Sequence, residues 1–139
     1  HSLLMAMSEF ENPIFNFIAP KELEMPSEYK MYLKEKGIRY FEHREFTDII
    51  SEADIIYMTR VQKERFSDPI EYEKVKNVYI LRNSMLKKTK PNVRILHPLP
   101  RVNEIHTDVD TNEKAYYFEQ ARNGVFTREA IIAHTMNVK

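Results

Sequence analysis

An arginine and a glutamine lie two positions apart, at Arg60 and Gln62, just after the run of residues 54–57. A guanidinium group binds a carboxylate through two parallel charge-assisted hydrogen bonds, and the Gln62 amide can donate to a second oxygen of the same ligand. Glu64 can hold Arg60 in one orientation through an ion pair. These residue types and their spacing predict a site for a small anionic molecule, although a solvated, charge-alternating surface loop would have the same composition.

A second candidate segment, residues 97–101, has the sequence His-Pro-Leu-Pro-Arg and follows the apolar run of residues 93–96. Its two prolines lack N–H donors and restrict φ, so the carbonyl oxygens of Pro98 and Leu99 are held in place and left free to accept hydrogen bonds. A ligand amide can donate to those two oxygens. A rigid connector without a ligand would need the same residues, so both roles stay open at this point.

Both segments need strands to position them. Residues 55–58 and 95–97 are predicted as buried strands, each with its candidate segment at the C-terminal end. Ligands of open α/β sheets bind at that end of the strands. Helical and extended patterns alternate along the chain, which predicts an α/β fold, a Rossmann-like parallel sheet with helices on both faces. The chain opens on a helical pattern at residues 2–11, whereas such folds usually begin with a central strand.

The remaining elements follow from caps and periodicity. Pro26 is placed near the start of a helix that ends at Gly37, which is suited to an αL cap. Asp68 is the predicted N-cap of a helix to about residue 75, with Pro69 at its first position. Further predicted elements are strands at residues 14–19, 38–41 and 78–81, helical segments at 47–51, 84–88 and 116–121, and a final helix at 127–137 capped by Thr127. No repeat or linker interrupts this pattern, so residues 1–139 are predicted to form one domain.

The composition is that of an ordinary globular protein, with 42% apolar and 30% charged residues among 139. Lys and Arg together number 21, as do Asp and Glu, and this balance argues against a dedicated nucleic-acid-binding protein. No apolar run approaches the roughly 20 residues of a transmembrane helix, so no membrane contact is predicted. Because the chain has no cysteine, disulfides are excluded and a cytoplasmic location is predicted.

The sequence contains no recognisable metal or cofactor motif. The five histidines lack metal-ligand spacing, and the only glycines, Gly37 and Gly124, cannot form a glycine-rich phosphate loop. Asp108 and Asp110 are better explained as turn and cap acids than as ligands of a divalent cation. His97 is better explained as a hydrogen-bonded structural residue than as a base. We therefore predict no metal and no cofactor.

Taken together, the two candidate segments resemble the aspartate carbamoyltransferase family, specifically the second, aspartate-binding domain of its catalytic chain. The resemblance runs from His1 to the final helix and covers essentially the whole chain. The matching segments are residues 1–3, 17–20, 35–38, 58–65, 97–101, 104–105, 107–110, 117–118 and 130–137. The two loop motifs occur in the family's order, and neither is a short pattern of the kind that recurs by chance.

The resemblance implies a role for each residue of the charged loop. In the family, the residues that match Arg60 and Gln62 bind the aspartate substrate, and the match to Glu64 orients the arginine. Arg65 is expected to support the loop or contacts between domains. Arg101 is expected to support the neighbouring turn in the same indirect way.

The resemblance also implies a role for the proline-containing turn. In the family, backbone oxygens matching those of Pro98 and Leu99 hold the amide of carbamoyl phosphate, and the bond matching Leu99–Pro100 is cis, a form that proline tolerates at low cost. One position departs from the family pattern. Asn103 stands where the best-known members carry an aspartate that pairs with a loop tyrosine, here Tyr72.

The implied reaction is carbamoyl transfer from carbamoyl phosphate to L-aspartate, which gives N-carbamoyl-L-aspartate and phosphate in pyrimidine biosynthesis. Family members place a carbamoyl-phosphate-binding domain before this one and assemble as homotrimers, some with added regulatory chains. We therefore expect this chain to be the C-terminal half of a larger enzyme, and the resemblance implies that the first, central strand of the sheet precedes His1. No catalytic residue is assigned in this half, and residues 1–139 alone are expected to show negligible turnover.

Two alternatives to this function are considered. Ornithine carbamoyltransferases carry a cysteine in the turn matching residues 97–100, which this chain lacks, and their cationic substrate would be repelled by an arginine loop. A non-catalytic α/β module, retained for assembly or regulation, would keep the fold with an empty pocket. Substitution of Arg60 in a full-length protein separates an enzyme from such a module.

Overall fold

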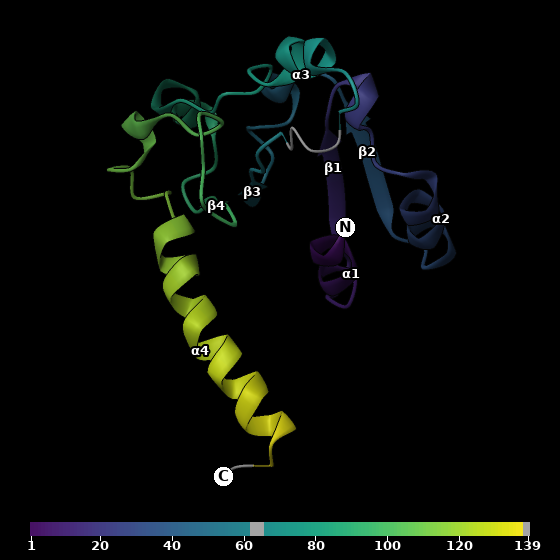
Figure 1. Ribbon diagram of the computed structural model, residues 1–139, viewed down its shortest axis with the longest axis vertical. Coiled ribbons are helices and arrows are strands. Elements are labelled where there is room, and N and C mark those ends of the chain that lie inside the picture. Colours follow the sequence, from purple (N-terminus) through teal and green to yellow (C-terminus); the bar gives the residue numbers. More distant parts are fainter. Residues whose placement is uncertain (62–65, 138–139) are drawn as a thin grey trace. The chain divides into compact units, whose positions relative to one another are not determined.

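The computed structural model of the chain describes residues 1–61 and 66–137 (Figure 1). The described residues form two compact units, His1–Ile49 and Ile50–Lys139. Each unit contains one two-stranded parallel sheet together with helices. The predicted α/β class with parallel strands is confirmed, and the strands of the predicted sheet are seen as two pairs, one in each unit.

In the first unit, α1 (Ser2–Met7) precedes β1 (Ile14–Ile18), and α2 (Ser27–Glu35) connects β1 to β2 (Arg39–His43). The two strands pair in parallel along their whole length. The chain leaves α2 through Gly37, whose φ of +69° is the left-handed conformation predicted for a C-terminal cap. The buried apolar side chains of this unit come from its helices, at Leu4 and Leu33.

In the second unit, β3 (Ile55–Tyr57) pairs in parallel with β4 (Arg94–Leu96). Ile56 lies opposite Ile95 and both are buried, as expected for β-branched side chains on a pleated surface. Ile95 also forms a bridge with Ala115 on its other side, so β4 lies between β3 and the segment that leads into the last helix.

The core of the second unit surrounds this small sheet. Its buried apolar side chains are Ile50, Ile56, Met58, Val75, Leu81, Leu86, Val93, Ile95, Ile105, Val109 and Tyr117. Two polar side chains of the described part of this unit, His97 and Glu104, are buried as well. A buried polar group is costly unless it is hydrogen-bonded, so these two residues indicate a specific arrangement at the end of β4.

The helix α3 (Pro69–Val75) begins and ends as predicted. The Asp68 side chain accepts a hydrogen bond from the Ile70 amide at 2.8 Å, and Pro69 occupies the first turn, where a missing N–H costs nothing. Short 3₁₀ segments in the part of the chain that the structure describes lie at Lys21–Leu23, Phe46–Asp48, Asn83–Lys88 and Thr107–Val109.

Three predicted elements are wrong in extent. The helical pattern of residues 2–11 forms a helix only to Met7, the segment 47–51 is a 3₁₀ turn at Phe46–Asp48, and of residues 78–81 only Leu81 pairs, in a bridge with Ile105. Each of these patterns is short, so it contains too few periodic residues to determine the secondary structure against the influence of tertiary contacts.

The last two predicted helices are in fact one continuous helix, α4 (Tyr117–Thr135). Thr127 lies inside it and does not cap it, because its hydroxyl donates to the Asn123 carbonyl one turn earlier, at 3.0 Å. Gly124 is also accommodated within the helix. A threonine hydroxyl inside a helix can donate to a backbone carbonyl one turn earlier. A threonine is therefore an ambiguous indicator of where a helix begins.

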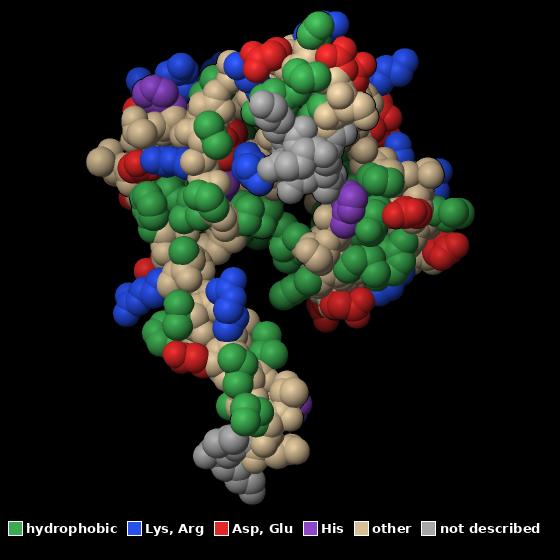
Figure 2. Space-filling model, viewed as in Figure 1, with side chains coloured by type: hydrophobic (Ala, Val, Ile, Leu, Met, Phe, Trp, Pro, Cys, Tyr) green, Lys and Arg blue, Asp and Glu red, His purple; other side chains and the backbone are tan. Residues whose placement is uncertain are grey.

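Most of α4 is exposed, since Tyr117 is its only buried residue in the part of the chain that the structure describes. Figure 2 shows hydrophobic side chains at intervals along this helix. The exposed large apolar residues are Phe118, Val125, Phe126, Ile131 and Ile132, followed by Met136 just after the helix. Within the described residues, no helix combines the length and apolar character that would let it cross a membrane.

Candidate functional site

The two segments singled out in the sequence leave the same edge of the sheet in the second unit. Because β3 and β4 are parallel, their C-terminal ends lie side by side. The pairing extends one residue further, where the Met58 amide donates to the Leu96 carbonyl at 3.0 Å. Beyond this point β3 continues into Thr59 and Arg60, and β4 continues into His97. The edge predicted from the two apolar runs is therefore present.

Only the first residue of the predicted aspartate-binding group lies in the described part of the chain. Arg60 is exposed, two residues after the last residue paired with β4. Gln62, Glu64 and Arg65 lie outside the described residues. The predicted ion pair between Glu64 and Arg60 and the contribution of Gln62 therefore stay predictions.

The turn after β4 has the backbone expected of it. The Leu99–Pro100 peptide bond is cis, and Leu99 has a φ of +45°. The Leu99 amide donates to Nδ1 of His97 at 2.8 Å. No hydrogen bond described within residues 1–61 and 66–137 ends on the carbonyl oxygen of Pro98 or Leu99.

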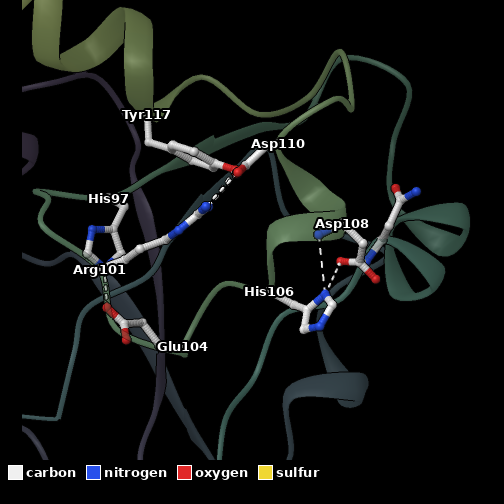
Figure 3. Close-up of polar contacts among 8 residues, drawn as sticks. His97, Arg101, Glu104, His106, Asp108, Asp110 and Tyr117 are labelled. Carbon is white, nitrogen blue, oxygen red and sulfur yellow. Dashed lines mark hydrogen bonds and ion pairs between the residues drawn. The ribbon is translucent and has the colours of Figure 1, made fainter.

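His97 is held from three sides at the start of this turn. Its side chain is 1% exposed, and its Nε2 lies 2.6 Å from Oε1 of Glu104 (Figure 3). Its backbone amide donates to the Gln120 side chain of α4 at 2.9 Å. Since Nδ1 accepts from the Leu99 amide, that nitrogen carries no proton, and the proton of the neutral ring is on Nε2. The structure agrees with the interpretation of His97 as a hydrogen-bonded structural residue.

Glu104 is the partner that the sequence did not reveal. Glu104 is 4% exposed as a whole residue. Its Oε2 accepts hydrogen bonds from the backbone amides of Val102 at 3.1 Å and Asn103 at 3.0 Å. Burial by itself raises the pKa of this carboxyl, but hydrogen bonds from the backbone of Glu104 itself and of Val102, together with His97, outweigh burial, so the pKa of Glu104 is lowered. The signal available in the sequence was the position of this carboxylate directly after Val102 and Asn103, whose backbone amides it can reach.

Arg101 closes the other end of the turn. Its guanidinium contacts both carboxylate oxygens of Asp110, with Nη2 2.5 Å from Oδ2, and its Nη1 lies 3.2 Å from the Tyr117 hydroxyl (Figure 3). The Tyr117 hydroxyl donates to Oδ1 of Asp110 at 2.5 Å. The hydrogen bond from Arg101 holds the pKa of Asp110 below its usual value, and burial raises the pKa of Tyr117 to about 12. Arg101 therefore anchors the turn to the first residue of α4.

The two acids considered as cation ligands are engaged elsewhere. Asp110 pairs with Arg101, and Asp108 accepts from the Asn83 amide at 3.1 Å and lies 3.1 Å from Nδ1 of His106. No group of three His, Cys, Asp or Glu side chains within residues 1–61 and 66–137 is arranged to hold a metal ion. The chemistry that this edge offers is hydrogen bonding by a guanidinium and by backbone oxygens.

Comparison with known proteins gives a consistent match. A family model described as aspartate/ornithine carbamoyltransferase, Asp/Orn binding domain, matches residues 1–135. The chain is 67% identical to the aspartate carbamoyltransferase catalytic subunit of Bacteroides thetaiotaomicron and covers 44% of that protein. It is 48% identical to the corresponding subunit of Clostridium novyi. The chain spans less than half the length of these curated relatives.

Solved structures give the same result. The catalytic subunit of M. jannaschii aspartate transcarbamoylase superimposes with a TM-score of 0.89 at 42% identity, covering 100% of this chain and 46% of that one. The aspartate transcarbamoylase of Trypanosoma cruzi, in complex with carbamoyl aspartate and phosphate, has a TM-score of 0.75 at 31% identity, covering 86% of this chain and 39% of that one.

Proposed function

The chain belongs to the aspartate/ornithine carbamoyltransferase family, and from this membership we propose that it supplies the aspartate-binding half of a carbamoyltransferase site. The reaction is transfer of the carbamoyl group of carbamoyl phosphate to the α-amino group of L-aspartate. Its products are N-carbamoyl-L-aspartate and phosphate. The observation that carries the proposal is the shared edge at which the segments after β3 and β4 begin, supported by relatives named for this activity.

Aspartate binding falls to the segment after β3. Arg60 binds one carboxylate of the substrate through its guanidinium fork, and Gln62 donates to a second oxygen. Glu64 and Arg65 serve to orient this loop. A guanidinium at this position favours an amino acid with a carboxylate side chain over ornithine, whose side chain carries a positive charge.

Carbamoyl positioning falls to the turn after β4. The carbonyl oxygens of Pro98 and Leu99 accept hydrogen bonds from the amide of carbamoyl phosphate and so orient its carbonyl carbon. The aspartate amine attacks that carbon, a tetrahedral oxyanion forms, and the C–O bond to phosphate breaks as the amine loses its proton. Catalysis of this kind rests on positioning and on preorganised charge. Groups that bind the phosphate belong, on this proposal, to an N-terminal domain and a neighbouring subunit.

The proposal extends to the assembly. A cytoplasmic homotrimer of full-length chains, in some family members joined by regulatory chains, is the state that the family resemblance implies. Light scattering of the full-length protein would measure the number of chains in the particle.

The direct test is a comparison of substrates. Full-length protein is supplied with carbamoyl phosphate and either L-aspartate or L-ornithine, and the carbamoylated product is identified by mass spectrometry. We expect N-carbamoyl-L-aspartate and no citrulline. Citrulline as the main product would replace this proposal with the ornithine reaction, and the absence of either product would point to a non-catalytic module.

The purified chain of residues 1–139 provides the companion measurement. It is expected to give negligible product under the same conditions, because half of the proposed site is supplied from outside these residues. Substantial turnover by this chain alone would contradict the divided site.

A further inference from the structure

We propose that Glu104 and His97 are positioning residues for the carbonyl oxygen of Pro98, acting through the backbone amide of Leu99. The inference rests on the proposed function and goes beyond it by naming the side chains that orient the carbamoyl-binding oxygen. Neither side chain would touch the substrate.

The first step is the geometry of a single peptide unit. The Pro98–Leu99 bond joins the Pro98 carbonyl to the Leu99 amide, and the only cis bond among the described residues is the next one, Leu99–Pro100. In a planar trans peptide the C=O and N–H point in opposite directions. Because the Leu99 amide points at Nδ1 of His97, at 2.8 Å, the Pro98 oxygen must point away from the His97 ring.

The second step is the fixing of the histidine ring. A ring that is free to rotate could not hold the peptide plane, but His97 is 1% exposed and donates from Nε2 to Oε1 of Glu104 at 2.6 Å. Both ring nitrogens are therefore used, one as acceptor and one as donor. The backbone amide of His97 is tied separately to Gln120, which fixes the residue at the end of β4.

The third step is the fixing of Glu104 itself. Its second oxygen accepts from the amides of Val102 and Asn103, so the carboxylate clamps the chain on the far side of the cis bond. The Glu104 carboxylate thus holds the turn at both ends. It binds Val102 and Asn103 directly on one side, and it acts on Leu99 through His97 on the other. A buried carboxylate with three donors is a rigid support, since each donor would be left unpaired if it moved.

The chain offers a matched control for this arrangement. Nδ1 of His106 accepts from the amide of Asp108, two residues on, at 3.2 Å, which repeats the contact between His97 and Leu99. His106 lies at an exposed 3₁₀ turn beside Asp108, five residues after the turn at residues 97–101. His106→Ala therefore removes the same type of hydrogen bond without touching the Pro98 peptide.

The experiment compares His97→Ala, His97→Asn and His106→Ala in the full-length protein. We expect His97→Ala to lower kcat about 10²-fold, the effect of a small misplacement of a reacting group. KM for aspartate should stay within about twofold, because the loop of Arg60 is unchanged. Asparagine at position 97 can still accept from the amide two residues on, as in an Asx turn, so His97→Asn should recover at least about tenfold of the loss. His106→Ala should retain wild-type kcat.

Each other outcome overturns a stated part of the argument. A folded His97→Ala protein with wild-type kcat, or a His97→Asn protein no better than His97→Ala, would overturn the inference while leaving the proposed function intact. An equal loss of kcat in His106→Ala would assign the effect to general destabilisation and overturn it too. Wild-type protein without turnover would overturn the proposed function and this inference together.

A spectroscopic measurement tests the hydrogen bonds independently of turnover. In ¹⁵N NMR of the full-length protein at neutral pH, His97 should have its proton on Nε2 and an unprotonated Nδ1. Glu104→Gln should shift both ring signals and the Leu99 amide signal. An unshifted Leu99 amide in Glu104→Gln would show that no coupling runs through the ring and would contradict the inference.

Discussion

Arg101 and Asp110 meet through two parallel contacts, with Nη2 2.5 Å from Oδ2 and Nη1 against Oδ1, and the Tyr117 hydroxyl joins them at 2.5 Å from Oδ1. This places a charge pair between the turn after β4 and the first residue of α4. A two-point arginine–carboxylate contact fixes orientation as well as distance. The turn is therefore held at its C-terminal end by Arg101 and at its start by His97, which is itself held by Glu104.

The charge pair predicts a dependence of stability on pH. Asp110 has an ordinary pKa of 3.8 that the hydrogen bond from Arg101 lowers in the folded protein. Its contribution to the free energy of unfolding is therefore complete above the unfolded pKa and is lost as the pH falls through the folded pKa. The stability difference between wild type and Asp110→Asn should be constant from neutral pH to about pH 5 and shrink below about pH 4. Urea unfolding at a series of pH values measures it, and a difference that grows in acid would contradict the assignment.

Removal of the tyrosine hydroxyl tests the third member of this group. Tyr117→Phe keeps the buried ring and removes the hydrogen bond to Asp110, so it should cost about 1–2 kcal/mol of unfolding free energy. Tyr116→Phe is the matched control, because the Tyr116 hydroxyl makes a long and therefore weak contact, 3.5 Å, with the side-chain nitrogen of Asn123. That change should stay within about 0.5 kcal/mol. Equal costs in urea unfolding would show that the Asp110 contact contributes nothing specific.

The role proposed for Arg60 predicts a large kinetic effect. Arg60→Ala in the full-length protein should lower kcat/KM for aspartate by about 10²–10³-fold, the range for a key charged contact. Arg60→Lys should recover little, because an ammonium group cannot form the two parallel contacts. Arg82→Ala, which changes an exposed arginine of the same unit, should stay within about twofold. Comparable values for the Arg60 and Arg82 variants would remove Arg60 from the site.

The helix ends give a contrast between a real cap and an apparent one. Asp68→Ala should cost about 1 kcal/mol, because the Ile70 amide loses its acceptor. Thr127→Ala should be neutral or stabilise by up to about 0.5 kcal/mol, since Thr127 lies inside α4 and alanine is the better helix former. Chemical denaturation of both variants measures the two values. A cost for Thr127→Ala as large as that for Asp68→Ala would indicate that the helix does break there.

Local patterns accounted for the parts of the fold that depend on neighbours in sequence. The Asp68 cap, the left-handed Gly37 and the two parallel strands that deliver the candidate segments could all be predicted this way. The cis bond at Leu99–Pro100 was expected through the family resemblance.

Contacts between residues far apart in sequence could not be predicted in the same way. Nothing in the residue pattern specifies that Gln120 of α4 caps the amide of His97, or that Tyr117 joins Arg101 to Asp110. Thr127 was misleading for a related reason, because its hydroxyl can bond forward as a cap or backward within a helix, and only the packed structure decides.

The exposed apolar side chains of α4 bear on how the protein can be handled. Phe118, Val125 and Ile132 recur every seven residues, which puts them on one flank of the helix. In a concentrated preparation of residues 1–139, the flanks of two molecules can associate, because contact between them removes apolar surface from water. Precipitation should therefore increase with protein concentration and with added sulfate. Changing Val125 and Ile132 to glutamine would then be the economical route to a sample that stays in solution.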